Sequence, residues 1–303
     1  MKILIIGGTG MIGAHAARHL RAHGDEVTVA GRGPIPAESP VAGFAQIQGD
    51  YTVPSFTLEQ LAAFDGVVFA AGQDVRHKKP EDDSREFWAN TQSVGVPRFA
   101  ELAKQAGVRR FVQVGSYYHQ LRPDLAEHNP YIAARKAADE GARALADDSF
   151  VACTLNPPSI IGAVPGPSAR RYRRMVSWAA GREPGIPDFA PIGGTNYMSA
   201  DSLAQAIRGA LLHGEPGAAY LVGDQNLSYR EFFQMLVDAA GSGRVIAERD
   251  EEHRLQPDAS IIQGRGNTLA YEPDAGDVRR LGYDRDDCVR AVEALVEVVS
   301  AAR

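Results

Sequence analysis

Short apolar runs alternate with amphipathic stretches through the first half of the chain. The apolar runs lie at residues 3–6, 27–30, 45–48, 66–71, 110–115 and 150–155, and they predict strands, the first of which is aliphatic enough to be buried on both faces. Helical spacing of apolar positions follows at residues 14–23, 58–64, 83–107, where Pro97 predicts a bend, and 131–146. Strands and helices that alternate in this way predict an α/β fold, a doubly wound parallel sheet with right-handed crossovers.

A glycine-rich turn joins the first strand to the first helix. It reads Gly7-Gly8-Thr9-Gly10-Met11-Ile12-Gly13, with the spacing Gly-x-x-Gly-x-x-Gly. Glycines let a backbone approach phosphates closely, and the N–H groups and dipole of a helix N-terminus favour negative charge. The turn therefore predicts a dinucleotide pyrophosphate site, although an ordinary glycine-rich turn is the alternative.

The pattern changes after Asn156, which divides the chain. Prolines and glycines interrupt residues 157–167, an arginine-rich helix follows, and the remaining predicted elements are helices at 201–213, 228–240 and 286–301 and a strand at 219–222. We expect residues 1–160 to form the dinucleotide-binding domain, with residues 194–223 returning to its sheet. Residues 161–193 and 224–303 should form a smaller substrate-binding region.

Composition narrows the class of protein. The 303 residues are 44% hydrophobic and 23% charged, which is typical of a globular protein, and the net charge of −6 gives no case for a nucleic acid or a membrane surface as partner. Cys153 and Cys288 lie far apart, without metal-ligand spacing, so we expect no disulfide framework, no metal site and a reducing, cytoplasmic location. Cys153 is expected in the core and Cys288 partly buried on a helix.

Several motifs together resemble the short-chain dehydrogenase/reductase superfamily, in its extended, epimerase/dehydratase-like branch. The motifs, in chain order, are the glycine turn, Gly49-Asp50, Ala70-Ala71-Gly72, Asn90, Gly115-Ser116, Tyr131, Asn156-Pro157-Pro158 and the stretch Asn196 to Asp201. The resemblance implies a Rossmann fold with a dinucleotide across the carboxyl edge of the sheet and a small-molecule substrate beside it. It also implies cofactor contacts from the following residues: Gly7, Thr9, Gly10, Met11, Ile12, Gly13, Asp50, Ala71, Gly72, Asn90 and Pro158.

The end of the second strand bears on the choice between NAD and NADP. An NAD site usually has an acidic residue about 20 positions after the glycine turn, but this chain has Arg32 there. A guanidinium suits a 2′-phosphate, so we expect NADP, with NAD as the weaker candidate. The alternative role of Arg32 is that of a solvated loop residue without a ligand. Asp50 is expected near the adenine, or else bonded to its own turn.

The resemblance also implies the catalytic residues. Tyr131 would be the general acid/base and Ser116 would hold the same substrate oxygen, with a lysine four residues after the tyrosine to lower its pKa. This chain has Arg135 at that position and Lys136 at the next. At about 100° per helical residue, Arg135 lies roughly 40° from Tyr131 and Lys136 roughly 140° away, so Arg135 is expected to be the partner of Tyr131 and to bind the ribose. A local distortion that brings Lys136 round is the alternative.

Two other features permit additional roles. His119 is close to Ser116 and could exchange a proton near neutral pH, although a loop histidine is more often a bystander. Four arginines at residues 170–174 could clamp a phosphate or carboxylate, but a solvated helix face is the preferred interpretation.

Three functions follow from this reading. The first is an NADP-dependent oxidoreductase that moves a hydride between the nicotinamide and a carbonyl or alcohol of a small, apolar substrate. The second is an NAD(P)-dependent epimerase or dehydratase of a nucleotide sugar, and the third a non-catalytic NADP-binding sensor. The resemblance implies a homodimer built on the two helices that contain Asn90 and begin at Tyr131.

Overall fold

The sheet predicted from the first half of the chain is present in the computed structural model, which describes residues 1–73, 78–79 and 81–301. Seven strands are all parallel and stand in the order β10-β6-β5-β4-β1-β2-β3. Their bounds are β1 (Lys2–Ile6), β2 (Glu26–Gly31), β3 (Ala45–Gln48), β4 (Gly66–Phe69), β5 (Arg110–Val114), β6 (Val151–Leu155) and β10 (Ala219–Tyr220). The α/β fold class is confirmed.

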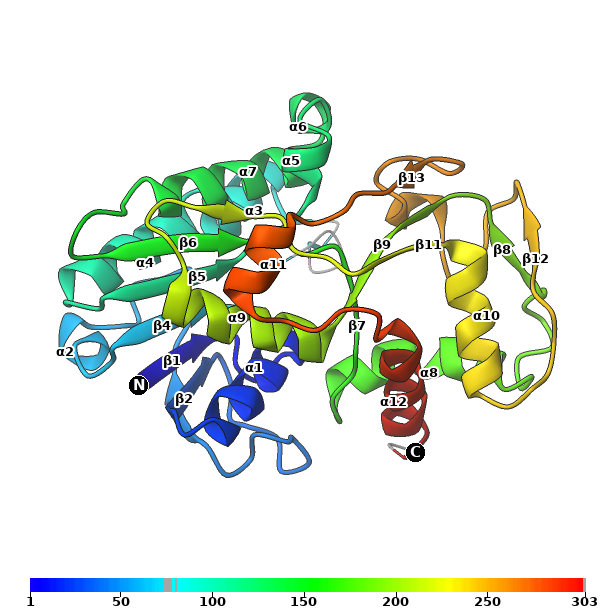
Figure 1. Ribbon diagram of the computed structural model, residues 1–303, viewed down its shortest axis with the longest axis horizontal. Helices are drawn as coiled ribbons and strands as arrows, with labels where there is room; N and C mark the ends of the chain where they lie inside the picture. The colour runs from blue at the N-terminus through cyan, green and yellow to red at the C-terminus, as the bar shows by residue number, and fades with distance from the viewer. Residues whose placement is uncertain (74–77, 80, 302–303) are drawn as a thin grey trace. The chain divides into compact units, whose positions relative to one another are not determined.

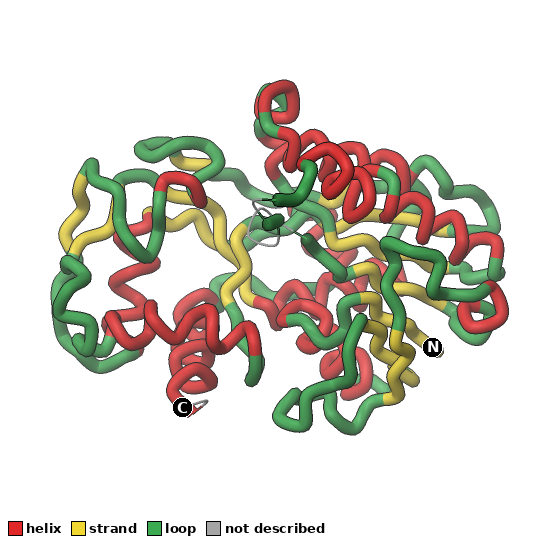
Figure 2. Tube along the Cα trace, turned by 180° about the vertical axis from the view of Figure 1, so that it is seen from behind, coloured by secondary structure: helices red, strands yellow, loops and turns green. Residues whose placement is uncertain are grey.

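Helices cover both faces of this sheet (Figures 1 and 2). Leu4, Phe69 and Phe111 pack with Phe99 and Ala138 of the helices on one face. These helices are α4 (Gly95–Gln105) and α7 (Pro130–Arg143), while α1 (Met11–Ala22) and α9 (Ala200–His213) cover the other face. Shorter helices are α2 (Leu58–Leu61), α3 (Ser84–Trp88), α5 (Tyr118–Leu121), α6 (Leu125–His128) and α11 (Ala275–Leu281). The sheet is therefore sandwiched, as fully apolar parallel strands require.

The long helix predicted over residues 83–107 is interrupted, and not at Pro97. A π-helical turn, η1 (Ala89–Ser93), separates α3 from α4, and the Val94 N–H donates to the Ala89 carbonyl at 2.9 Å. Gly95 closes this turn, because a Cβ there would lie 1.9 Å from the Asn90 carbonyl oxygen. Pro97 lies in the first turn of α4, where an N–H is not needed.

The chain divides into two units. Unit 1 contains residues 1–157, 202–222 and 274–283, and unit 2 contains residues 158–201, 223–273 and 284–303. We expected residues 194–223 to return to the first sheet. Only α9 and β10 do so, because β9 (Gly194–Ser199) pairs with β7 (Ser159–Ile161), β11 (Gln225–Ser228) and β13 (Thr268–Leu269) in a second sheet.

Unit 2 has its own core, formed by α8 (Pro167–Ala179), α10 (Tyr229–Ala239) and α12 (Cys288–Ala301). A strand pair, β8 (Phe189–Pro191) with β12 (Ala247–Arg249), and the 3₁₀ turn η2 (Asp258–Ser260) complete it. Trp178 and Phe233 have no more than trace exposure, and their rings stand edge to face at 5.1 Å. Ser228 caps α10 in a capping box with Glu231.

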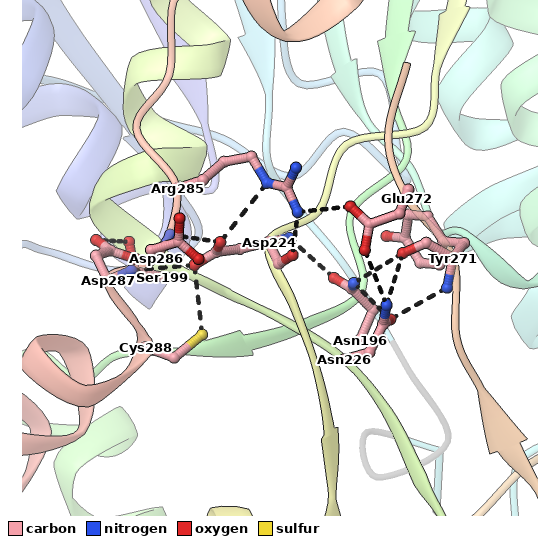
Figure 3. A network of polar contacts seen from close by, with 10 residues as sticks. All are labelled: Asn196, Ser199, Asp224, Asn226, Tyr271, Glu272, Arg285, Asp286, Asp287 and Cys288. Carbon is pink, nitrogen blue, oxygen red and sulfur yellow. Dashed lines mark hydrogen bonds and ion pairs between the residues drawn. The ribbon is translucent and has the colours of Figure 1, made fainter. Parts of the chain in front are cut away.

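A buried carboxylate fixes the start of α12 (Figure 3). Asp224 accepts hydrogen bonds from the N–H groups of Asp286 and Asp287, at 2.6 and 3.2 Å. Asp286 has a φ of +63°, so the helix begins at Cys288 and not at residue 286 as we expected. Cys288 is fully buried, more than we expected, and Cys153 lies in the core of unit 1.

Candidate active site

The glycine turn after β1 forms a cradle that leaves no room for side chains. Gly7 has a φ of +81°, and a Cβ there would lie 2.7 Å from the backbone of Ala71 at the end of β4. A Cβ at Gly13 would lie 2.3 Å from the Gly7 carbonyl oxygen. These contacts hold the turn against the sheet, so that its backbone can approach a ligand closely.

The helix that follows the turn starts without a competing anion. Gly10 is the N-cap of α1 and has no side chain to bond the first N–H groups, and the first turn contains no acidic residue. Gly10 is exposed, and Met11 and Ile12 are partly exposed. The cradle and this open helix end therefore fit the pyrophosphate of a dinucleotide.

Arg32 lies just beyond the carboxyl end of β2, beside the cradle. Its side chain is exposed and makes no hydrogen bond or ion pair with the described residues. Thr9 reaches the same strand end, since a Cβ on Gly31 would be 3.3 Å from its hydroxyl oxygen. The Arg32 guanidinium is thus available to a ligand at this edge.

Asp50 follows β3 and is committed in part to its own loop. Its Oδ1 accepts hydrogen bonds from the Thr52 N–H at 2.9 Å and the Thr52 hydroxyl at 2.7 Å. Its backbone N–H and carbonyl both bond the Ser55 hydroxyl. Oδ1 of Asp50 therefore stabilises its own turn, as one interpretation predicted, and only Oδ2 would be left for a role near the adenine.

Ala71 and Gly72 follow β4. Ala71 touches the glycine turn, and Gly72 is exposed, with open space where a Cβ would stand. Asn90 has an exposed side chain on η1. The buried amide of that turn is Gln92, which donates to the Gln73 carbonyl at 2.9 Å. Sequence reasoning missed Gln92, because a π turn shifts every later side chain relative to helical spacing.

Ser116 and Tyr131 lie on neighbouring elements at the carboxyl end of the sheet. Ser116 is buried just after β5, and its hydroxyl makes no hydrogen bond to the described residues. Tyr131 is the second residue of α7, which Asn129 caps by accepting from the Tyr131 N–H at 3.0 Å. The Tyr131 ring is half-buried and packs on Trp88, with centroids 5.1 Å apart.

Arg135 is buried and Lys136 is exposed. Arg135 donates from its two Nη atoms to Gln92 Oε1 at 3.3 Å and to the Val114 carbonyl at 3.1 Å, while its buried Nε–H has no partner. Lys136 instead pairs with Glu140 on the surface, at 3.7 Å. The unpaired Nε–H leaves Arg135 able to bind a further oxygen.

His119 belongs to a buried hydrogen-bonded pair and is not a bystander. Its Nε2 lies 2.8 Å from Asp139 Oδ2, and the two side chains are 5% and 1% exposed. Arg143 contacts the same carboxylate from the next turn of α7, at 2.7 Å. Burial alone would raise the pKa of Asp139, but hydrogen bonds from His119, Arg143 and Thr154 outweigh it and lower the pKa to about 2.

Two predicted features fall in unit 2. Pro158, predicted to contact the cofactor, is buried and is the first residue of that unit. Arg170, Arg173 and Arg174 are exposed on α8. The spacing of these three arginines puts them on one face of the helix.

Taken together, the strand order, the glycine cradle and the open start of α1 define a dinucleotide-binding Rossmann fold. The model of the NAD dependent epimerase/dehydratase family matches residues 3–223, and the chain belongs to this family. It is therefore an NAD(P)-dependent enzyme of the short-chain dehydrogenase/reductase type. The non-catalytic function has no support. No helix among the described residues has the length and apolar character needed to cross a bilayer.

Known proteins resemble the chain over most of its length or more. A 2-alkyl-3-oxoalkanoate reductase of Stenotrophomonas maltophilia is 27% identical over 265 residues, which cover 81% of this chain and 77% of that protein. A UDP-glucose-4-epimerase structure from Stenotrophomonas maltophila, with bound NAD and formylated UDP-arabinopyranose, has a TM-score of 0.73 at 19% identity and covers 99% and 98% of the two chains. The UDP-N-acetylglucosamine 4-epimerase of Bacillus cereus gives 0.70 at 15% identity, over 98% and 96%. The two structures share the fold.

Proposed function

We propose that the chain is an NADP(H)-dependent reductase that acts on a carbonyl group of a small 3-oxo acid or related compound. The observation that carries this proposal is the arrangement on α7, where the half-buried Tyr131 is followed one turn later by the buried cation of Arg135. The similarity to a 2-alkyl-3-oxoalkanoate reductase supports the substrate class.

In the proposed reaction each side chain has a separate task. Tyr131 gives the proton that the carbonyl oxygen takes up, and the Ser116 hydroxyl holds that oxygen by a hydrogen bond. The positive charge of Arg135 stabilises the phenolate left on Tyr131, and its free Nε–H binds a ribose hydroxyl. When bound, the nicotinamide cofactor supplies the hydride for the carbonyl carbon.

The preference for NADP rests on Arg32. Its exposed guanidinium lies at the strand end next to the cradle, and Asp25 and Glu26 stand before and at the start of β2, away from that end. We expect Arg32→Ala to weaken NADPH binding by about 10- to 100-fold and to leave NADH binding unchanged. Arg109→Ala is the matched control, because Arg109 is exposed just before β5, at the amino ends of the parallel strands and away from the cradle. Equal effects of Arg32→Ala on both cofactors would contradict the preference.

Consumption of NADPH tests the reaction itself. The purified chain should oxidise NADPH steadily when it is given a 2-alkyl-3-oxoalkanoate, and Tyr131→Phe should lower kcat by about 10²- to 10⁴-fold while NADPH still binds. Near-normal turnover by Tyr131→Phe would remove the tyrosine from the mechanism.

An epimerase or dehydratase of a nucleotide sugar is the second candidate. The exposed arginine face of α8 favours it, because guanidinium groups suit a diphosphate. Such an enzyme regenerates its cofactor in each turnover and would keep it bound. Denaturing the purified chain and measuring dinucleotide absorbance separates the two candidates: stoichiometric retained cofactor favours the epimerase or dehydratase, and exchangeable cofactor favours the reductase.

A further inference from the structure

The loop that carries Ser116 is fixed by the side chain of Asn156. The Ser116 N–H donates to Asn156 Oδ1 at 2.8 Å, and Asn156 has no solvent exposure at the end of β6. Gly115 leaves the space for this contact, because a Cβ there would lie 1.9 Å from the same oxygen. The bond is thus built into the close approach of β5 and β6.

The other end of the Asn156 amide faces a buried carboxylate. Its Nδ2 lies 3.0 Å from Gln120 Oε1 and 3.4 Å from Asp139 Oδ2. His119 and Arg143 also donate to Asp139, at 2.8 and 2.7 Å. An ionised carboxylate only accepts hydrogen bonds, so the NH₂ group of Asn156 must point toward Asp139.

We propose that Asn156 is a positioning residue for Ser116 and that Asp139 sets the direction of its amide. The reversed amide would place its NH₂ group against the Ser116 N–H, so that two donors would face each other. Asp139 lies two turns after Tyr131 on α7, and the network therefore ties the serine loop to the helix that carries the tyrosine. The inference rests on the proposed role of Ser116 in holding the substrate oxygen.

A double-mutant cycle between Asn156 and Ser116 tests the proposal. The four proteins are the parent, Asn156→Ala, Ser116→Ala and the double variant, assayed for NADPH oxidation with a 2-alkyl-3-oxoalkanoate. Asn156→Ala should lower kcat by about 10- to 100-fold, because a misplacement of about 1 Å costs that much, and should leave the KM and the Kd for NADPH within about threefold. If Asn156 acts through Ser116, the double variant should be no slower than Ser116→Ala alone.

Asp139→Asn provides a second cycle that does not create a cavity. It removes the charge that directs the Asn156 amide, and we expect a loss in kcat of about 3- to 10-fold that also vanishes in the Ser116→Ala background. If Asn156→Ala does not fold, this second cycle tests the positioning role of Asn156 by itself. Cys153→Ala is the control for packing on β6, because Cys153 is equally buried but makes no contact with Ser116.

The outcomes separate the two proposals. Losses that multiply in the double variants, or a kcat loss in Cys153→Ala as large as that in Asn156→Ala, would overturn the positioning role. A Ser116→Ala enzyme with parental kcat would instead overturn the catalytic role of Ser116.

Discussion

Replacing Asp139 by Asn should destabilise unit 1 by an amount that shrinks at low pH. The hydrogen bonds to Asp139 lower its pKa from 3.8 to about 2, which corresponds to about 2 kcal/mol of folding free energy at neutral pH. Asp139→Asn also leaves the buried His119 without its anionic partner, so we expect a total loss of about 2–4 kcal/mol at pH 7. Because the folded-state pKa lies below the unfolded value, this stabilisation is complete above about pH 5 and is lost as the pH falls toward 2.

Tryptophan fluorescence can report unit 1 alone. The chain has two tryptophans, Trp88 in unit 1 and Trp178 in unit 2, so a Trp178→Phe background leaves only the probe that packs on Tyr131. Urea unfolding of this protein with and without Asp139→Asn should differ most at pH 7, and about half of the charge-linked 2 kcal/mol should remain at pH 3. Glu140→Gln is the matched control, because Glu140 is the next residue of α7 and is exposed. A difference that stays constant from pH 7 to 3, or that Glu140→Gln reproduces, would refute the reasoning.

Three further predictions concern the cradle and unit 2. Gly13→Ala puts a methyl group 2.3 Å from the Gly7 carbonyl oxygen, so we expect NADPH binding to weaken at least about tenfold. Titration of NADPH fluorescence measures this affinity, and an unchanged affinity would show that the cradle is not the binding site. Asp224→Ala leaves the first N–H groups before α12 without an acceptor and should cost unit 2 about 2–3 kcal/mol, followed by Trp178 emission in a Trp88→Phe background. Burial lowers the pKa of His253 below its usual 6.5, so the stability of unit 2 should fall as the pH drops below that value, and His253→Gln should flatten the dependence seen in the same emission.

The strands and the glycine cradle could be predicted because each depends on neighbours in sequence. A strand buried on both faces needs an unbroken apolar run such as Ile3 to Ile6, and a phosphate cradle needs glycines within a single turn. The helix angle predicts that Arg135, and not Lys136, lies on the side of Tyr131, and in the structure Arg135 is buried while Lys136 is exposed. Each of these features can therefore be predicted from a short stretch of sequence.

The features that sequence reasoning missed depend on contacts between distant residues. The π turn at Ala89–Ser93 closes through the approach of Gly95 to the Asn90 carbonyl, which no hydrophobic period reveals. The contacts of Asn156 with Ser116 and Asp139 join residues 40 and 17 positions apart. The type of a residue does not predict which distant residue it contacts, so this buried network could be identified only from the folded structure.

Because arginine stands where lysine was expected, the residue one turn after Tyr131 on α7 has a different chemical role in the proposed mechanism. Lysine has one mobile ammonium group that can also lose a proton, whereas arginine stays charged and keeps its donors in a rigid plane. Gln92 and the Val114 carbonyl hold that plane by one hydrogen bond to each Nη atom, and the buried Nε–H is a donor without a partner. In the proposed reaction Arg135 can therefore fix the ribose and stabilise the phenolate of Tyr131, but it cannot return a proton to it. The proton that Tyr131 gives up must come back from solvent or from the substrate side, and the serine that orients the substrate oxygen becomes correspondingly more important.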